Sequence, residues 1–314
     1  MSSKKLKVAR EDSTLRILLR QFLKNPAGVA GLAIVTLMIL GAIFAQQVTG
    51  YDQAAFDVTA SFHSPNWHHL MGTDQLGSDI FARVLYGGRA SIYIGVLSSL
   101  LGNLIGTFLG ATAGYIGGKF DAILMRISEL VMTFPQLILV LICVSLLGQG
   151  VNNVILIFAM TGWMTTFRLV RGEFFSLREE AFVEADRAFG FSKSRIIFRH
   201  MLPNTLSPIV VAFTVNTAIY IIAEAGLSFL GLGVPITTPT WGNLLAAAQS
   251  PVVVNQYWWL WVFPAIAIMA FVFGVNFIGD ALRDVLDPRQ RTASIKRTLL
   301  SKIIPGRSSK KGNS

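Results

Sequence analysis

Glu224 is the carboxylate whose surroundings in this sequence are most unusual for an ionisable group, because it lies within a long apolar run. An acid at membrane depth is costly to bury and is by default a functional candidate. It could line a polar pathway, bind an amino terminus, or hold a gate against a polar group of a partner. The alternative is a structural acid that is hydrogen-bonded at the end of a helix. Asn216, in the same run, has the same interpretations.

The other residues that could do chemistry form no pattern typical of an active site, such as Ser-His-Asp, Cys-His or paired carboxylates. His63, His68 and His69 cluster, but they lack the i, i+4 spacing and the carboxylates of a metal site, which favours surface residues over metal ligands. Cys143 is the single cysteine, so an intrachain disulfide is impossible. The Gly-Gly-Lys segment at 117–119 lacks the first glycine and the Ser/Thr of a phosphate loop. We therefore expect no catalytic residue, no metal and no cofactor in this chain.

The composition is typical of a membrane protein. Of the 314 residues, 53% are hydrophobic and only 14% are charged, whereas a soluble domain has about a quarter charged residues. Much of the net charge of +10 comes from the two ends of the chain. Basic ends set the orientation in a membrane and attract lipid headgroups, and no recognition fold for nucleic acid accompanies them. We expect an all-α integral membrane protein that contacts lipid and not nucleic acid.

Six apolar runs are long enough to cross a bilayer. The predicted spans are 28–45, 91–115, 123–147 with a kink at Pro135, 151–170, 208–230 and 257–278. A cleaved signal peptide is the competing interpretation of the first run, but the basic segment before it is too long and no cleavage site follows. With the N-terminus inside, only Arg83 and Arg89 of the 27 Lys and Arg residues lie outside. Both termini are therefore predicted to be cytoplasmic.

These spans divide the chain into four predicted parts. They are a cytoplasmic tail at 1–25, a first transmembrane helix and polar external loop at 26–90, a five-helix core at 91–281, and a basic cytoplasmic tail at 282–314. In the first tail, residues 15–24 have the pattern of an interfacial amphipathic helix, which Asn25-Pro26 ends. In the second span, four glycines recur every four residues, so we expect one face that another helix approaches closely. They are Gly102, Gly106, Gly110 and Gly114.

The core contains one long polar segment rich in both signs of charge, residues 176–204, which we expect to be a cytoplasmic loop. Its first four residues, Ser-Leu-Arg-Glu, have the form of a capping box and predict a helix start. Apolar residues then recur at helical spacing until Gly190, which is expected to end the helix. The apolar face consists of Leu177, Ala181, Phe182, Ala185, Ala188 and Phe189. A second short helix is predicted over 194–201. Two exposed phenylalanines on a short helix favour docking into a groove of another protein, and a helix lying on the membrane surface is the alternative.

Residues 184–190 (Glu-Ala-Asp-Arg-Ala-Phe-Gly), followed by Leu202-Pro203, resemble the "EAA" coupling loop of ABC-importer permeases. The pattern of that family is Glu-Ala-Ala, three residues, Gly, and then a distal Ile-x-Leu-Pro. Asp186 stands at the second Ala and His200 stands at the Ile. The second departure resembles the His-x-Leu-Pro-Asn form of dipeptide, oligopeptide and nickel permeases.

Three further segments resemble the C-type subunit of dipeptide and oligopeptide permeases in particular. They are the external segment 69–91, the segment 224–242 at the end of the fifth span, and the segment 279–289. The resemblance covers nearly the whole chain, from residue 25 to residue 289.

The resemblance implies a type I ABC-importer transmembrane fold with six helices in the cytoplasmic (inner) membrane. It implies a heterodimer with a homologous second permease subunit, two ATPase subunits that bind ATP and Mg, and an extracytoplasmic substrate-binding protein. Docking to the ATPases is implied for Phe182, Glu184, Ala185, Asp186, Phe189 and Gly190. Glu224 and Asn216 are candidates for the translocation pathway.

The expected cargo is a dipeptide or another short peptide, with nickel, glutathione or another small solute as alternatives. A different class, an ion-gradient-driven secondary transporter, predicts buried ionisable pairs and broken helices in matching halves of the chain. Glu224 is the one residue that approaches this pattern. A purely structural membrane scaffold is a third interpretation, and it predicts no ATP-dependent flux.

Overall fold

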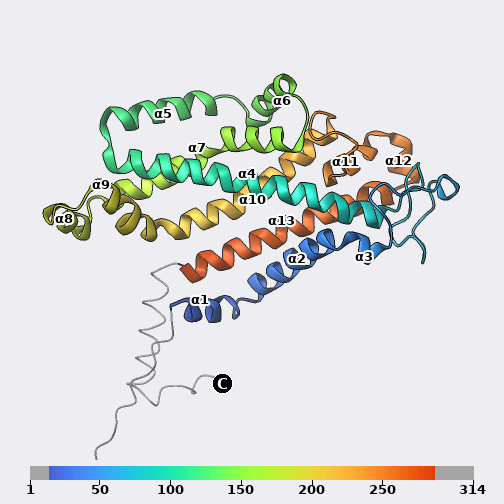
Figure 1. The fold of residues 1–314 in the computed structure, drawn as a ribbon, viewed down its shortest axis with the longest axis horizontal. Helices are drawn as coiled ribbons and strands as arrows, with labels where there is room; N and C mark the ends of the chain where they lie inside the picture. The colour runs from blue at the N-terminus through green and yellow to red at the C-terminus, as the bar shows by residue number, and fades with distance from the viewer. Residues whose placement is uncertain (1–13, 287–314) are drawn as a thin grey trace, which may run out of the picture.

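A computed structural model of the chain describes residues 14–286, so most of both predicted tails, residues 1–13 and 287–314, lies outside the described residues. The described part is all-α, with long helices running roughly side by side and short helices gathered near the two ends (Figure 1). The long elements are α2 (Pro26–Ile43), α4 (Ile80–Ile116), α5 (Gly118–Met132), α6 (Gln136–Leu147), α7 (Val151–Leu177), α10 (Leu206–Phe229) and α13 (Trp259–Leu286). The short elements are α1 (Thr14–Phe22), α3 (Ala45–Thr49), η1 (Val58–Ala60), α8 (Ala181–Ala188), α9 (Lys193–Arg195), η2 (Ile196–Met201), η3 (Leu202–Thr205), α11 (Trp241–Leu245), η4 (Ala246–Gln249) and α12 (Pro251–Gln256).

Five of the six predicted spans are confirmed as helices that are long and apolar enough to cross a membrane: those of α2, α4, α7, α10 and α13. The sixth, predicted as one span with a kink at Pro135, is instead two helices, α5 and α6, that meet at 86°. Pro135 has no backbone N–H and its carbonyl accepts the first bonds of α6, so the chain restarts there rather than bending smoothly. The pair still carries the chain from the α8 end to the opposite end, as one crossing would (Figure 1).

Several helices are longer than the predicted spans. The loop predicted over 50–90 ends at Asp79, whose carboxylate accepts from the Ala82 amide and caps α4. Helix α7 continues to Leu177 rather than 170, and α13 continues to Leu286 rather than 278. The prediction was wrong here because an apolar run marks only the part of a helix that suits lipid, while helical hydrogen bonding continues beyond it. Between the predicted spans 208–230 and 257–278, the chain also forms α11, η4 and α12.

The predicted helix of the first tail forms as α1, and Phe22 packs on the end of α13 against Ala281 and Val285. The predicted break is confirmed, since the Asn25 side chain accepts from the Gly28 amide and caps α2 just before Pro26. Asn25 thus marks the boundary between the first tail and helix α2.

The glycine face of α4 packs directly on α7, which confirms the predicted close approach. A Cβ atom added to Gly106 would lie 2.4 Å from the Trp163 carbonyl oxygen, and one added to Gly110 would lie 2.7 Å from that of Phe167. At Gly102 the nearest atom would be 3.5 Å away, an ordinary contact. The two backbones therefore touch along this face without intervening side chains.

We expect Gly106→Ala to destabilise the subunit by about 1–3 kcal/mol, because the added methyl overlaps backbone that cannot turn aside. Gly102→Ala is the matched control, one turn away on the same face, and should be nearly neutral. Thermal unfolding of the two purified variants in detergent compares them. Equal unfolding temperatures for the two variants would show that α4 and α7 are packed less closely at Gly106 than described above.

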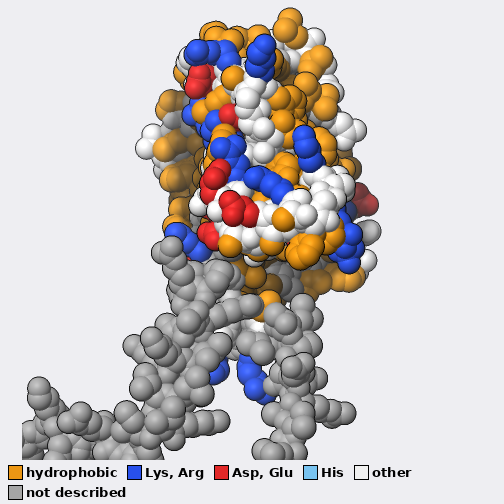
Figure 2. All heavy atoms as spheres, turned by 90° about the vertical axis from the view of Figure 1, so that its left-hand side faces the viewer, with side chains coloured by type: hydrophobic (Ala, Val, Ile, Leu, Met, Phe, Trp, Pro, Cys, Tyr) orange, Lys and Arg blue, Asp and Glu red, His pale blue; other side chains and the backbone are white. Residues whose placement is uncertain are grey.

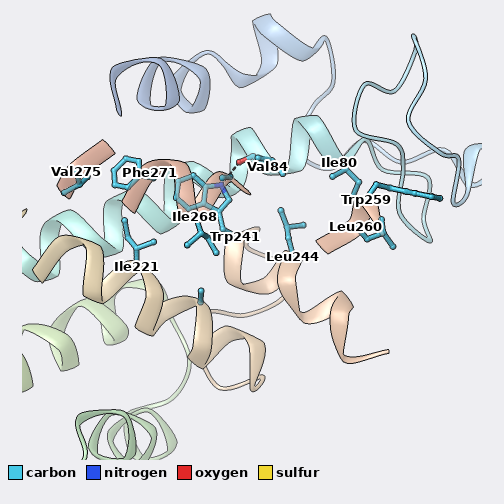
Figure 3. Packing of buried hydrophobic residues seen from close by; sticks show 12 residues of the cluster. Ile80, Val84, Ile221, Trp241, Leu244, Trp259, Leu260, Ile268, Phe271 and Val275 are labelled. Carbon is cyan, nitrogen blue, oxygen red and sulfur yellow. Dashed lines mark hydrogen bonds between the residues drawn. The ribbon is translucent and has the colours of Figure 1, made fainter. Parts of the chain in front are cut away.

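A buried apolar cluster ties the end opposite α8 together (Figure 3). Trp241 of α11 lies at its centre, and its indole N–H donates to the Val84 carbonyl of α4 at 2.9 Å. The ring of Phe271 of α13 lies beside it, with the ring centroids 5.8 Å apart, and Ile221 of α10 belongs to the same cluster. The segment after α10 is thereby fixed to three long helices.

Candidate docking helix and translocation cavity

The predicted helix of segment 176–204 forms as α8, but it does not start at the predicted capping box. Ser176 and Leu177 belong to the last turn of α7, and α8 begins at Ala181 without a side-chain cap. The Glu179 carboxylate accepts from Nε of Arg178 at 2.9 Å instead of bonding to a backbone amide. The local pattern was misleading because α7 runs on beyond its apolar stretch and takes up these residues.

One face of α8 attaches it to the rest of the chain. Val183 is fully buried against Phe174 and the residues of η2. Asp186 and Arg187, three and four residues later, lie on the same face. The Arg187 guanidinium lies 5.3 Å from the centre of the Tyr115 ring, and Asp186 contacts His200.

The opposite face of α8 is apolar and open. Phe182 is 40% exposed and Phe189 is 78% exposed. Ala181, Ala185 and Ala188 are exposed beside them. Within residues 14–286 nothing covers this face, which is the apolar face predicted from the sequence except for Leu177, which belongs to α7.

Charged side chains surround this end of the molecule. Figure 2 looks onto it and shows Lys and Arg side chains gathered there, with a few acidic side chains among them. Those exposed in the loop itself are Arg187, Lys193, Arg195 and Arg199. Glu184 is also exposed, at the edge of the open apolar face.

Gly190 ends α8 as predicted. Its φ is +72°, in the left-handed region that glycine adopts without strain. The Phe191 amide then donates to the Asp186 carbonyl at 3.1 Å, which closes the helix end. An added Cβ would meet no atom within 4 Å, so the backbone conformation, and not space, requires glycine here.

The second predicted helix, 194–201, forms as α9 followed by η2, whose hydrogen bonding is that of a π-helix. Such wide turns are rare and are frequent at functional sites. The Asn204 side chain donates to the His200 carbonyl at 2.7 Å. The sequence Leu202-Pro203-Asn204 thus ends the wide turn, because Pro203 cannot donate and Asn204 supplies a side-chain donor instead.

Glu224 is completely buried and hydrogen-bonded. Its Oε1 accepts from the Ser228 hydroxyl at 2.7 Å and its Oε2 accepts from the Ser91 hydroxyl at 3.2 Å. Thr240 supplies a third hydroxyl, and the Trp241 amide donates to the Ser91 hydroxyl at 3.0 Å. The carboxylate therefore joins α4, α10 and the start of α11.

Asn216 lies in a polar contact between three long helices and also lines a cavity. Its side chain donates to the Thr166 hydroxyl at 3.3 Å, and that hydroxyl donates to the Asn103 side chain at 2.7 Å. The cavity, of about 350 Å³, lies between the bend of α5 and α6, helix α7 and helix α10. Its other polar lining residues are Gln136, Thr161, Thr165 and Tyr220.

These four residues were not among the candidates predicted from the sequence, although the spacing of two of them indicated a shared polar face. Thr161 and Thr165 are four residues apart in an apolar run, and so share one face of a helix. Glu224 is not among the residues that line the cavity. A role for Glu224 in a pathway stays a prediction.

The three histidines of the predicted external loop, His63, His68 and His69, form no group that could hold a metal ion. Nδ1 of His69 lies 2.9 Å from Oδ2 of Asp79, the capping residue of α4, and its ring stacks on Tyr51. Across the described residues 14–286, no group of three His, Cys, Asp or Glu side chains could hold a metal ion.

Comparison with known families bears on the whole chain. The family described as "Binding-protein-dependent transport system inner membrane component" matches residues 102–292, which include α8 and the cavity. The chain belongs to this family. A second family, the "N-terminal TM domain of oligopeptide transport permease C", matches residues 13–65. This inner membrane component is accordingly a multi-pass transport protein and not an enzyme, and the predicted resemblance to C-type permeases is confirmed.

Named relatives cover most of its length. The oligopeptide transport system permease protein OppC of Bacillus subtilis is 38% identical over 289 residues, 92% of each chain. The dipeptide transport system permease protein DppC of the same organism is 36% identical over 272 residues, 87% of this chain and 85% of the relative. The glutathione transport system permease protein GsiD of Pectobacterium atrosepticum is 39% identical over 274 residues, 87% of this chain and 90% of the relative.

Proposed function

We propose that this inner membrane component is the permease subunit of an ATP-driven importer that carries dipeptides or short peptides across the cytoplasmic membrane. The observation that carries the proposal is α8, a short helix held on one face and apolar and open on the other. Such a helix suits a groove in an ATPase subunit, since this chain has no nucleotide motif of its own. The names of the relatives support a peptide cargo.

The proposed assembly contains a second, homologous permease, two ATPase subunits that bind ATP and Mg, and an external binding protein. Phe182 and Phe189 fill the ATPase groove, and Glu184 contacts the rim of that groove. Ala185 lies between the two phenylalanines on the same face. Asp186 and Gly190 set the position of the helix and its end. When ATP closes the ATPase pair, α8 moves with it and the pathway turns outward to receive peptide from the binding protein.

We also propose that the cavity beside Asn216 is part of the pathway. Its polar lining groups are neutral amides and hydroxyls, which can hydrogen-bond a peptide without holding it through charge. Weak, uncharged contacts suit a pathway that has to release what it binds. Glu224 serves this pathway indirectly, by holding the outer segment at Trp241 against α4 and α10.

Uptake of a labelled dipeptide into proteoliposomes tests the function. The full assembly should accumulate dipeptide when ATP reaches the ATPases, and ionophores that collapse ion gradients should have no effect. Unlabelled tripeptide, glutathione and Ni²⁺ are added as competitors to identify the cargo class. Uptake that needs no ATPase and follows an ion gradient would establish the secondary-transporter alternative, and no flux under any condition would favour a scaffold.

Filling the cavity is expected to block uptake. Thr165→Trp places a large ring among the lining residues. It should lower the uptake rate by about tenfold or more while the ATPases remain bound, since a barrier raised by about 1.4 kcal/mol slows a step tenfold. Thr112→Trp is a control, because Thr112 lies on α4 away from the cavity. Unchanged uptake in Thr165→Trp would place the pathway elsewhere.

A further inference from the structure

The two residues of segment 176–204 that depart from the coupling-loop pattern contact each other. Nδ1 of His200 lies 2.5 Å from Oδ2 of Asp186, and the two side chains are only 23% and 13% exposed. They are fourteen positions apart in the chain. The pattern has Ala and Ile at these positions, so one polar contact stands where the pattern has two apolar side chains.

The contact matters because α8 has few other attachments. A helix of eight residues is too short to be stable by itself in water. Val183 is its single fully buried side chain within the described structure. One buried residue fixes the distance of a helix from its support but leaves it free to rotate about that point. Asp186, on the same face, supplies the second fixed point.

The second residue of the contact, His200, is connected directly to a long apolar helix. His200 lies in the π-helical turn η2, and η2 continues through η3 into the long helix α10. The Phe191 ring packs edge-on against the imidazole at 5.5 Å, and Asn204 holds the His200 carbonyl. The nearby Arg187 and Arg195 guanidinium groups lie over the rings of Tyr115 and Phe191 instead of competing for the carboxylate.

We propose that Asp186 and His200 form a positioning pair that transmits the movement of α8 to the base of α10. The proposal rests on the docking role proposed above for α8. It assigns Asp186 to transmission rather than to the ATPase surface, because its carboxylate faces this chain. Removing one partner alone should therefore leave the ATPases attached but uncoupled from uptake, because the remaining polar side chain has no partner and no longer holds α8 in position.

Three variants of the full assembly test it: Asp186→Ala, His200→Ile and the double variant Asp186→Ala/His200→Ile. In His200→Ile a mostly buried carboxylate loses its partner, and the peptide carried per ATP hydrolysed should fall by about tenfold or more. In Asp186→Ala the imidazole is left unpaired and the loss should be smaller, because an imidazole is cheaper to leave unpaired than a carboxylate. In the double variant no unpaired group remains, and coupling should return to within about threefold of the original.

The decisive result is rescue, in which adding Asp186→Ala to His200→Ile improves coupling. Losses that simply add in the double variant, or unchanged coupling in both single variants, would overturn the proposal. If His200→Ile alone fails to assemble, a double variant that assembles supports the pair, and one that also fails overturns it.

A parallel assembly carrying Phe182→Ala and Phe189→Ala separates this proposal from the docking role. That variant should lose the ATPase subunits on purification, whereas the Asp186 and His200 variants should keep them. If the phenylalanine variant keeps its ATPases and its uptake, the docking role itself has failed. If it loses them while the pair shows no rescue, only the positioning pair has failed.

Discussion

Replacing Phe182 and Phe189 together by alanine is expected to abolish ATP-driven uptake while the subunit still inserts in the membrane. Both side chains lie on the open face of α8, and Phe189 is 78% exposed. Burying a Phe side chain in a groove contributes about 1.5–3 kcal/mol. Two such losses amount to about a hundredfold or more in affinity for the ATPase subunits.

Co-purification of the ATPases and uptake in proteoliposomes measure this effect. Phe56→Ala is the matched control, because Phe56 is 66% exposed and belongs to the segment between α3 and η1. Helix α3 lies at the end of the molecule opposite α8 (Figure 1). It should retain both activities. A double variant that binds ATPases as well as the unaltered chain would mean that the ATPases contact another surface.

Glu224→Ala is expected to prevent most of the subunit from reaching its folded state. The change leaves three hydroxyls without their common acceptor and opens a void where α4, α10 and α11 meet. Unmade hydrogen bonds and the void together cost about 3–5 kcal/mol, a large part of the stability of most folded proteins. The measurement is the fraction of subunit that elutes as a single species after detergent extraction.

Glu224→Gln separates a structural role from a charge-dependent one. An amide of the same size still accepts from one hydroxyl and donates to another, so the variant should fold and should transport peptide at close to the original rate. A variant that folds normally but transports nothing would instead show that the acid itself takes part in transport.

The elements that depend on local sequence could be predicted, and those that depend on distant partners could not. The lengths of the apolar runs predicted the spans, and a repeat of glycines predicted the face of α4 that contacts α7. The angle between α5 and α6 could not be predicted, because Pro135 indicates an interruption but not its direction. The hydroxyls around Glu224 could not be predicted from the neighbouring sequence either, since Ser91 is 133 positions away in the chain.

The docking helix shows the same limit on a smaller scale. The apolar periodicity identified the open face with Phe182 and Phe189, because these residues repeat at helical spacing. The attaching face was missed, since the residues three and four positions from Val183 on either side are charged and Asp186 has its partner in another element. Asp186 and His200 were each noticed as departures from a pattern, but only the structure shows that they are one contact.

The glycine face between α4 and α7 restricts how this protein can change shape. Sliding one helix along the other by a single residue would bring a side chain to a place where only a hydrogen atom fits. The close packing therefore fixes the register of the two helices, and we expect them to move together as one rigid body. Helices α5 and α6, whose bend borders the cavity, contain no glycine after Gly118 and so form no glycine face of this kind. In the pathway proposed above, the change of shape that opens the cavity therefore has to involve the other elements that border it, α10 and the bend between α5 and α6.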